Sequence, residues 1–137
     1  MSSRIFHTDA MDWQDRGQGV RSLPLAHRGT GADQVLTGMT EIPVGGTIPL
    51  HTHSSEEFIL VLEGRAVVRV DGDERPVSAM DATLIEAGVE HQFVNVGEGV
   101  LRILWVYGDP DTTRTLVDSG ETLGHLDPYP AGTVGSS

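Results

Sequence analysis

The sequence contains no cysteine and no lysine, and each absence removes a class of chemistry. Without cysteine there can be no disulfide, no thiolate nucleophile and no sulfur-ligated metal site. Any bound metal must therefore be held by nitrogen and oxygen ligands. Without lysine, Schiff-base catalysis, pyridoxal attachment and the lysine of a P-loop are excluded.

Positive charge is scarce, with 9 basic against 20 acidic residues and a formal net charge of −11. An acidic protein is repelled by the phosphates of nucleic acids and of anionic membranes, so we expect neither as a partner. No stretch approaches the roughly 20 apolar residues of a membrane span, and residues 1–7 lack the apolar core of a signal peptide. We therefore expect a cytoplasmic protein.

The 137 residues suffice for one domain, and their pattern is that of an all-β protein. Short apolar or alternating runs are separated by Gly and Asp, which favours a sandwich or barrel. Asp71-Gly72 is a strong two-residue hairpin signal. The expected strands are 34–42, 58–62, 65–70, a return strand through Pro76 and Val77, 82–85, 91–96 and 101–107, with a possible edge strand at 20–25.

Four side chains with metal-ligating chemistry follow a distinct spacing. His51 and His53 are two apart, so on a strand their imidazoles point the same way. Glu57 follows a polar corner, and a further strand can return its carboxylate to the same point. Glu56 has the wrong parity and is expected to be solvated. His91 follows the turn at Gly88 and begins another alternating run.

The complete spacing resembles the two motifs of the cupin family over residues 35–107. The first is Gly45, five residues, His51, one residue, His53, three residues, Glu57, six residues, Gly64. The second ends in Gly88, two residues, His91, three residues, Asn95, while Met80 and Glu86 stand where the family has glycine and proline. From Met80 we expect that its turn needs no positive φ angle.

The resemblance implies a double-stranded β-helix, or jelly-roll barrel, that holds one divalent metal through His51, His53, Glu57 and His91. We assign residues 34–110 to this barrel, 1–33 to an N-terminal flanking segment and 111–137 to a C-terminal extension with a disordered tail at 131–137. The segment 112–126 packs over the barrel or over a partner subunit, and the sequence leaves both open.

Strand parity predicts the walls of the substrate pocket. If His91 faces inward, so does Phe93, and on the last strand we favour Ile103, Trp105 and Tyr107 because this places Arg102 outside. Met39 is added from the early strand, where Glu41 shares its face. The predicted pocket is Met39, Phe93, Ile103, Trp105 and Tyr107. His7, His27 and His125 show no partner spacing and are expected at the surface.

Three neutral imidazoles and one carboxylate leave two open positions on an octahedral divalent ion, for which Fe, Mn, Co, Ni, Cu and Zn all qualify. We expect a metal-dependent enzyme acting on a small, oxygen-chelating and anionic molecule, of dioxygenase or decarboxylase type. The alternatives are a redox-neutral isomerase, lyase or cyclase that uses the metal as a Lewis acid, and a small-ligand-binding protein without turnover. The redox-neutral chemistry requires a general base, for which Tyr107 and Glu41 are the candidates.

The run Phe58 to Leu62 is apolar on both faces of its strand. One face can line the barrel interior, and the other needs a cover of its own. We therefore expect a homodimer.

Overall fold

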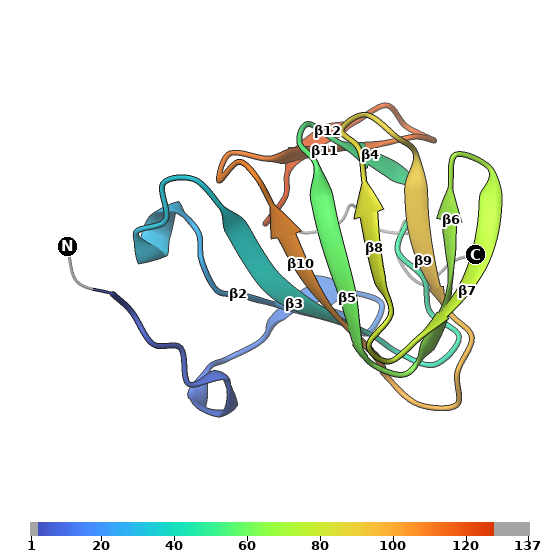
Figure 1. Cartoon of the computed structure of the whole chain (residues 1–137), viewed down its shortest axis with the longest axis horizontal. Helices are drawn as coiled ribbons and strands as arrows, with labels where there is room; N and C mark the ends of the chain where they lie inside the picture. Colours follow the sequence, from blue (N-terminus) through green and yellow to red (C-terminus); the bar gives the residue numbers. More distant parts are fainter. Residues whose placement is uncertain (1–2, 128–137) are drawn as a thin grey trace.

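The computed structural model describes residues 3–127, so the tail predicted at 131–137 lies outside the described residues. The chain forms two six-stranded antiparallel sheets that pack face to face as a jelly-roll barrel (Figure 1). One sheet has the order β1-β2-β3-β10-β5-β8 and the other β12-β11-β4-β9-β6-β7. The strands are β1 (Gln14–Gly17), β2 (Val20–Pro24), β3 (Leu36–Ile42), β4 (His51–His53), β5 (Glu57–Glu63), β6 (Arg65–Val70), β7 (Asp73–Ser78), β8 (Ala82–Ile85), β9 (His91–Asn95), β10 (Leu101–Tyr107), β11 (Thr113–Leu116) and β12 (Thr122–Gly124), with short 3-10 helices η1 (Thr8–Ala10) and η2 (Arg28–Thr30).

The hairpin between β6 and β7 turns where the sequence predicted it. Asp71 and Gly72 both have positive φ angles, 49° and 87°, as a two-residue turn of this kind requires. The strands β6, β8 and β10 have the predicted bounds. The all-β fold class is therefore confirmed.

The core lies between the two sheets, and β10 supplies its centre. Leu101, Ile103, Trp105 and Tyr107 are all buried, which confirms the inward face predicted for this strand. The Trp105 indole donates a hydrogen bond to Thr40 Oγ1 at 2.8 Å, so its one polar atom is satisfied inside the core.

The inward face predicted for β3 is wrong. Met39 is the cross-strand partner of Leu104, and Glu41 that of Arg102. Paired residues share one face of a sheet, so Met39 and Glu41 lie on the outer face while Gly38, the partner of Trp105, faces inward. A Cβ added to Gly38 would lie 2.6 Å from the Trp105 ring. Only glycine leaves room for the indole at this position.

Two turns of the barrel need positive φ angles. Gly64 has a φ of 95°, and a Cβ there would lie 2.6 Å from the Val100 carbonyl oxygen, so this motif position requires glycine. Met80 has a φ of 75°. The expectation that its turn needs no positive φ is wrong: the turn keeps the left-handed conformation although the residue is not glycine.

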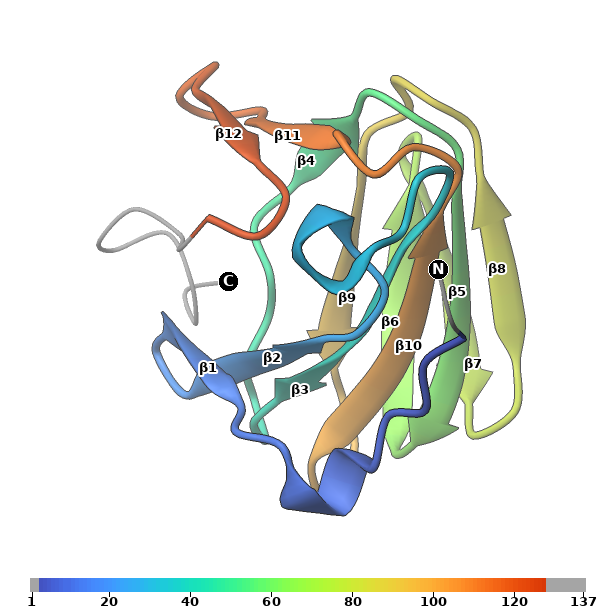
Figure 2. The same cartoon turned by 90° about the vertical axis from the view of Figure 1, so that its left-hand side faces the viewer.

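The segments on either side of the barrel motifs add strands to its sheets. β1 and β2 extend one sheet beyond β3, and β11 and β12 extend the other beyond β4 (Figure 2). Residues 112–126 thus pack on the barrel of their own chain. Among the described residues, no helix is long and apolar enough to cross a membrane.

Candidate metal centre

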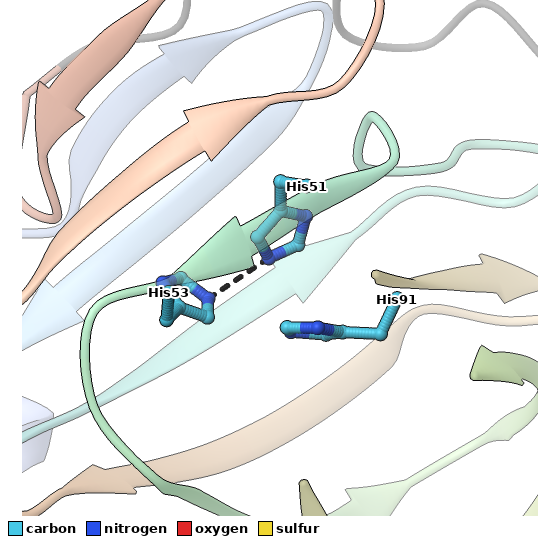
Figure 3. A group of neighbouring side chains, drawn as sticks. All are labelled: His51, His53 and His91. Atoms are coloured by element: carbon cyan, nitrogen blue, oxygen red, sulfur yellow. Dashed lines mark hydrogen bonds between the residues drawn. The ribbon is translucent and has the colours of Figure 1, made fainter. Parts of the chain in front are cut away.

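Three histidines from two neighbouring strands meet inside the barrel. His51 and His53 lie on the same face of β4, and His51 is the cross-strand partner of His91 on β9. All three are buried, and one ring nitrogen from each lies within 4.8 Å of the others (Figure 3). The imidazoles of His51 and His53 thus point to the same side of the strand, as their spacing of two predicted.

Glu57 reaches the same point from the opposite sheet. Its Oε1 lies 2.9 Å from His91 Nε2 and 3.6 Å from His53 Nε2, and the residue is buried at the start of β5. The structure thus brings the four predicted ligands together, three as one histidine group and Glu57 beside it. Glu56 is exposed, as expected from its parity.

Backbone carbonyls fix the tautomer of each histidine. The Nδ1 of His51 lies 2.7 Å from the Pro49 oxygen, and that of His91 lies 2.8 Å from the Val89 oxygen. The Nδ1 of His53 lies 3.3 Å from the Thr113 oxygen. Because a carbonyl only accepts, each Nδ1 carries the proton and each Nε2 presents its lone pair, the form in which histidine binds metals.

The Nε2 atoms of His51 and His53 are 2.9 Å apart, the contact drawn dashed in Figure 3. With both protons on Nδ1, this contact sets one lone pair against another and needs a cation to stabilise it. Two adjacent ligands at ~2.1 Å from a metal in octahedral geometry stand ~3.0 Å apart. The observed separation matches, so these residues fit a divalent ion.

His51 and His53 are held neutral, as metal ligands must be. Burial is the main reason that the pKa values of His51 and His53 lie well below the ordinary value of 6.5. Neighbouring imidazoles lower them further, His91 in the case of His51 and His51 in the case of His53.

The Tyr107 hydroxyl orients the carboxylate. It donates a hydrogen bond of 2.5 Å to Glu57 Oε2 and lies 2.9 Å from His53 Nε2. Glu57 Oε1 is thereby left to face His91. Tyr107 acts on the candidate metal through Glu57 as a positioning residue.

A cavity adjoins the histidines, with about 380 Å³ of empty space, part of it open to solvent. About 20 Å³ of it can take the centre of a water molecule, which is close to what one water requires. Phe93, Ile103, Trp105 and Tyr107 line it, where the sequence expected them. The full lining is Arg16, Thr40, Ile48, His51, Glu57, Ile59, His91, Phe93, Ile103, Trp105, Tyr107 and His125.

Met39 and Glu41 do not belong to this cavity, which corrects the predicted pocket and removes Glu41 as a candidate base. Glu41 instead accepts hydrogen bonds on the outer face, from Arg21 at 2.6 Å and from Arg102 at 2.5 Å. Arg102 lies outside, as predicted, but in an ion pair.

His125 is a site residue that the sequence did not reveal. The prediction that it lies at the surface is wrong, because the residue is 8% exposed and its ring packs against Trp105 and Tyr107. Burial, and then the charges of Arg114 and Arg16, hold the pKa of His125 well below 6.5. His7 is exposed and His27 caps η2, so neither joins the site.

Comparison with known proteins agrees with this architecture. The family described as "Cupin domain" matches residues 38–107. Polyketide synthase CurC from Streptomyces cyaneus is 35% identical over 91 residues, which are 66% of this chain and 58% of CurC. Tetracenomycin polyketide synthase protein TcmJ from Streptomyces glaucescens is 28% identical over 116 residues, 84% of this chain and 72% of TcmJ.

Among solved structures, the polyketide cyclase RemF from Streptomyces resistomycificus superimposes with a TM-score of 0.71 at 21% identity. The match covers 97% of this chain and 89% of RemF. It therefore includes the strands on both sides of the barrel motifs as well as the barrel itself.

Proposed function

Because this chain belongs to the cupin family, we propose that it is a metal-dependent enzyme acting on a small molecule with chelating oxygens. We further propose that the substrate is a poly-β-carbonyl compound or its enol and that the reaction is a redox-neutral cyclisation. The observation that carries the proposal is the 2.9 Å separation of His51 Nε2 and His53 Nε2 in a buried site, with both Nδ1 atoms facing backbone carbonyl oxygens.

The charge of the site suits a substrate of this kind. Three neutral imidazoles and one carboxylate on a divalent ion leave a net positive centre, which attracts an enolate or a pair of carbonyl oxygens. A bound divalent ion would supply Lewis-acid polarisation of a carbonyl group and would stabilise negative charge on oxygen. The residues that would hold it are His51, His53, Glu57 and His91.

The side chains that line the cavity suit contact with a flat, conjugated molecule, for which the cavity has to widen beyond the single water that it takes as it stands. Phe93 and Trp105 offer aromatic surface, and Ile48, Ile59 and Ile103 exclude water around it. The names of CurC and TcmJ connect those relatives with polyketide synthesis, and RemF is a polyketide cyclase. Poly-β-carbonyl chains are the chelating substrates of that chemistry.

Tyr107 favours the redox-neutral alternative over the dioxygenase or decarboxylase that the sequence favoured. From the sequence, the redox-neutral chemistry required a general base, for which Tyr107 and Glu41 were only candidates, and Glu41 lies on the outer face. In the structure, Tyr107 Oη holds its proton between Glu57 and His53. A proton is therefore available beside the metal-binding residues, where an enolate of the substrate would form and would later be protonated.

Turnover of a model poly-β-ketone tests the proposal. Protein loaded with Zn²⁺ is given heptane-2,4,6-trione, and NMR follows its cyclisation with loss of water, while an electrode follows O₂. We expect more than stoichiometric turnover without O₂ uptake, abolished in the His51→Ala, His53→Ala double variant.

Three other outcomes contradict this function. O₂ uptake in step with substrate loss in the Fe²⁺ form would identify a dioxygenase, and CO₂ release from a 2-oxo acid would identify a decarboxylase. Saturable binding without turnover of any of these compounds would identify a ligand-binding protein.

A further inference from the structure

The geometry points to His125 as a substrate-binding residue: we propose that its imidazole forms a hydrogen bond with a polar atom of the substrate, away from the metal-binding oxygens. The inference rests on the proposed function, because it requires an oxygen-chelating substrate in the cavity. It adds that this substrate carries a further hydroxyl or carbonyl group beyond its chelating pair.

The imidazole of His125 is buried and forms no hydrogen bond with residues 3–127. Neither Nδ1 nor Nε2 forms a hydrogen bond within the described part of the chain, although the residue is only 8% exposed. Leaving a buried polar group without a partner is costly, and proteins rarely do so without a reason. The neutral ring offers one donor and one acceptor. A ligand in the cavity would satisfy them.

His125 faces the same cavity as the histidine group. It is among the lining residues, and its ring lies edge-on to Trp105 at 4.5 Å between centroids. The Tyr107 ring is also 4.5 Å away, and the ring of His53 is 5.2 Å away. A ligand bound at the metal and lying along the Trp105 side would reach His125 by widening the cavity, which as it stands takes about one water.

Two buried arginines hold the backbone of His125 in place. Arg16 on β1 donates to the carbonyl oxygens of His125 and Asp127 at 3.1 and 2.9 Å. Arg114 on β11 donates to the same two oxygens, at 2.6 Å in the case of His125. Arginines from both sheets thus fix the short segment from His125 to Asp127. A histidine exposed at the surface would not require such contacts.

The placement defines the chemistry of the ligand. A minimal 1,3-diketone carries only the two oxygens that engage the metal and has no further polar atom to offer His125. An extended planar compound with a third oxygen, such as a polyhydroxylated aromatic ketone or a longer poly-β-carbonyl chain, would engage both. We infer that the site selects the second class.

A pair of probes that differ by one hydroxyl group tests this inference. 2′-Hydroxyacetophenone has a chelating pair of oxygens only, and 2′,4′-dihydroxyacetophenone adds a hydroxyl on the far side of the ring. Calorimetry on Zn²⁺-loaded protein gives both dissociation constants. We expect wild type to bind the second probe about tenfold more tightly than the first, as one hydrogen bond to a buried group would give.

Replacing the imidazole should remove this preference alone. In His125→Phe we expect a ratio near one, an unchanged zinc content and a Tm that is not lowered, because an apolar ring replaces an unpartnered polar one. His125→Leu is the second apolar variant, and His125→Gln should retain part of the ratio. His7→Phe, an exposed position, should keep the full ratio.

The possible failures are separable. If both probes bind and the ratio is the same in wild type and His125→Phe, the inference is wrong and the proposed function stands. If His125→Phe or His125→Leu loses zinc, His125 serves the metal rather than the substrate, which also overturns the inference. If neither probe binds the loaded protein, the proposed function and the inference both fail.

Discussion

At the scale of single residues, the site depends on which nitrogen of each histidine holds the proton. Carbonyl oxygens of Pro49, Val89 and Thr113 take the Nδ1 protons, so all three Nε2 lone pairs converge. Partners of this kind fix ring orientation and raise ligand basicity. The backbone thus prepares the site before any ion arrives.

Tyr107→Phe tests the positioning of Glu57. The variant keeps the buried ring and removes the hydroxyl that donates to Glu57 Oε2. Loss of such a partner typically weakens metal affinity 10–100-fold, and we expect a loss of about this size. Competition with a chromogenic chelator measures it, and thermal melting verifies the fold. An affinity equal to that of wild type would show that Glu57 needs no help from Tyr107.

Met80→Gly tests the left-handed turn before β8. A side chain in this conformation costs roughly 1–2 kcal/mol of folding free energy. Glycine removes that cost, but its greater conformational freedom in the unfolded chain offsets about half of the gain. Since Met80 is 71% exposed, little packing is lost. We expect the free energy of unfolding in urea to rise by roughly 0.5–1 kcal/mol. Met80→Ala keeps the Cβ and should gain nothing, and a loss of stability in Met80→Gly would contradict the account.

At the scale of elements, one carboxylate links three strands on the outer face of the barrel. Glu41 on β3 pairs with Arg21 on β2 and with Arg102 on β10. Burial alone would raise the pKa of Glu41, but the hydrogen bonds from Arg102 and Arg21 outweigh it, and the pKa is lowered below 4.5. The folded protein therefore favours the ionised form more strongly than the unfolded chain does.

The sign of this shift predicts a pH dependence. The stabilisation by Glu41 is present above pH 4.5, the unfolded value, and is lost as pH falls through the lower folded pKa. Glu41→Gln should therefore be less stable than wild type at pH 7, and the difference should shrink toward pH 3. Urea titrations at several pH values measure it. A difference that is equal at pH 7 and pH 3 would rule out the ionised pair as its source.

Most strands of the barrel were predictable from the sequence, but β1, β11 and β12 were not, and neither were the faces of some of the predicted strands. On β10 one alternating set is uniformly large and apolar and the other contains Arg102, so the strand's own residues decided the face. On β3 both alternating sets mix polar and apolar residues, and pairing of Met39 with Leu104 decides instead. The register between two strands depends on both of them and on the core, so it cannot be predicted from the sequence of one strand.

The metal ligands were predictable for a related reason, and His125 was not. His51 and His53 lie on one face of a single strand, so strand geometry relates them. Glu57 lies on the opposite sheet and was predicted from the resemblance of the spacing to the cupin motif. The backbone of His125 is bound by Arg16, which lies 109 positions away along the chain and carries no local signal of the contact. The positive φ angle of Met80 was not predicted because the local signal was misleading: a residue other than glycine argues against that conformation.

At the scale of the whole molecule, the outer face is apolar where β5 lies beside β8 and the middle of β10. Phe58 is the cross-strand partner of Leu84, and Leu60 that of Leu104. Phe58 is 40% and Leu84 65% exposed, which leaves contiguous apolar surface for a partner. The strand that supplies the barrel interior with Ile59 thus turns an equally apolar face outward, and a second copy of this chain is the cover we predict.

Light scattering tests the dimer. We expect wild type to have twice the mass of one 14.7 kDa chain, and Leu84→Glu to shift it toward the monomer by placing a charge in the apolar contact. Val96→Glu is the matched control, because Val96 is exposed but follows β9 in the other sheet. A monomeric wild type at micromolar concentration would contradict the prediction.

The central claim is that His51, His53, Glu57 and His91 together hold one divalent transition metal. Its most direct test is the metal content of protein purified without chelator, measured by mass spectrometry of the elements in wild type and in the His51→Ala, His53→Ala variant. The account predicts about one ion per chain in wild type and none in the variant. A wild type that carries no metal and binds none of Mn²⁺, Fe²⁺, Ni²⁺ and Zn²⁺ when they are supplied would contradict it.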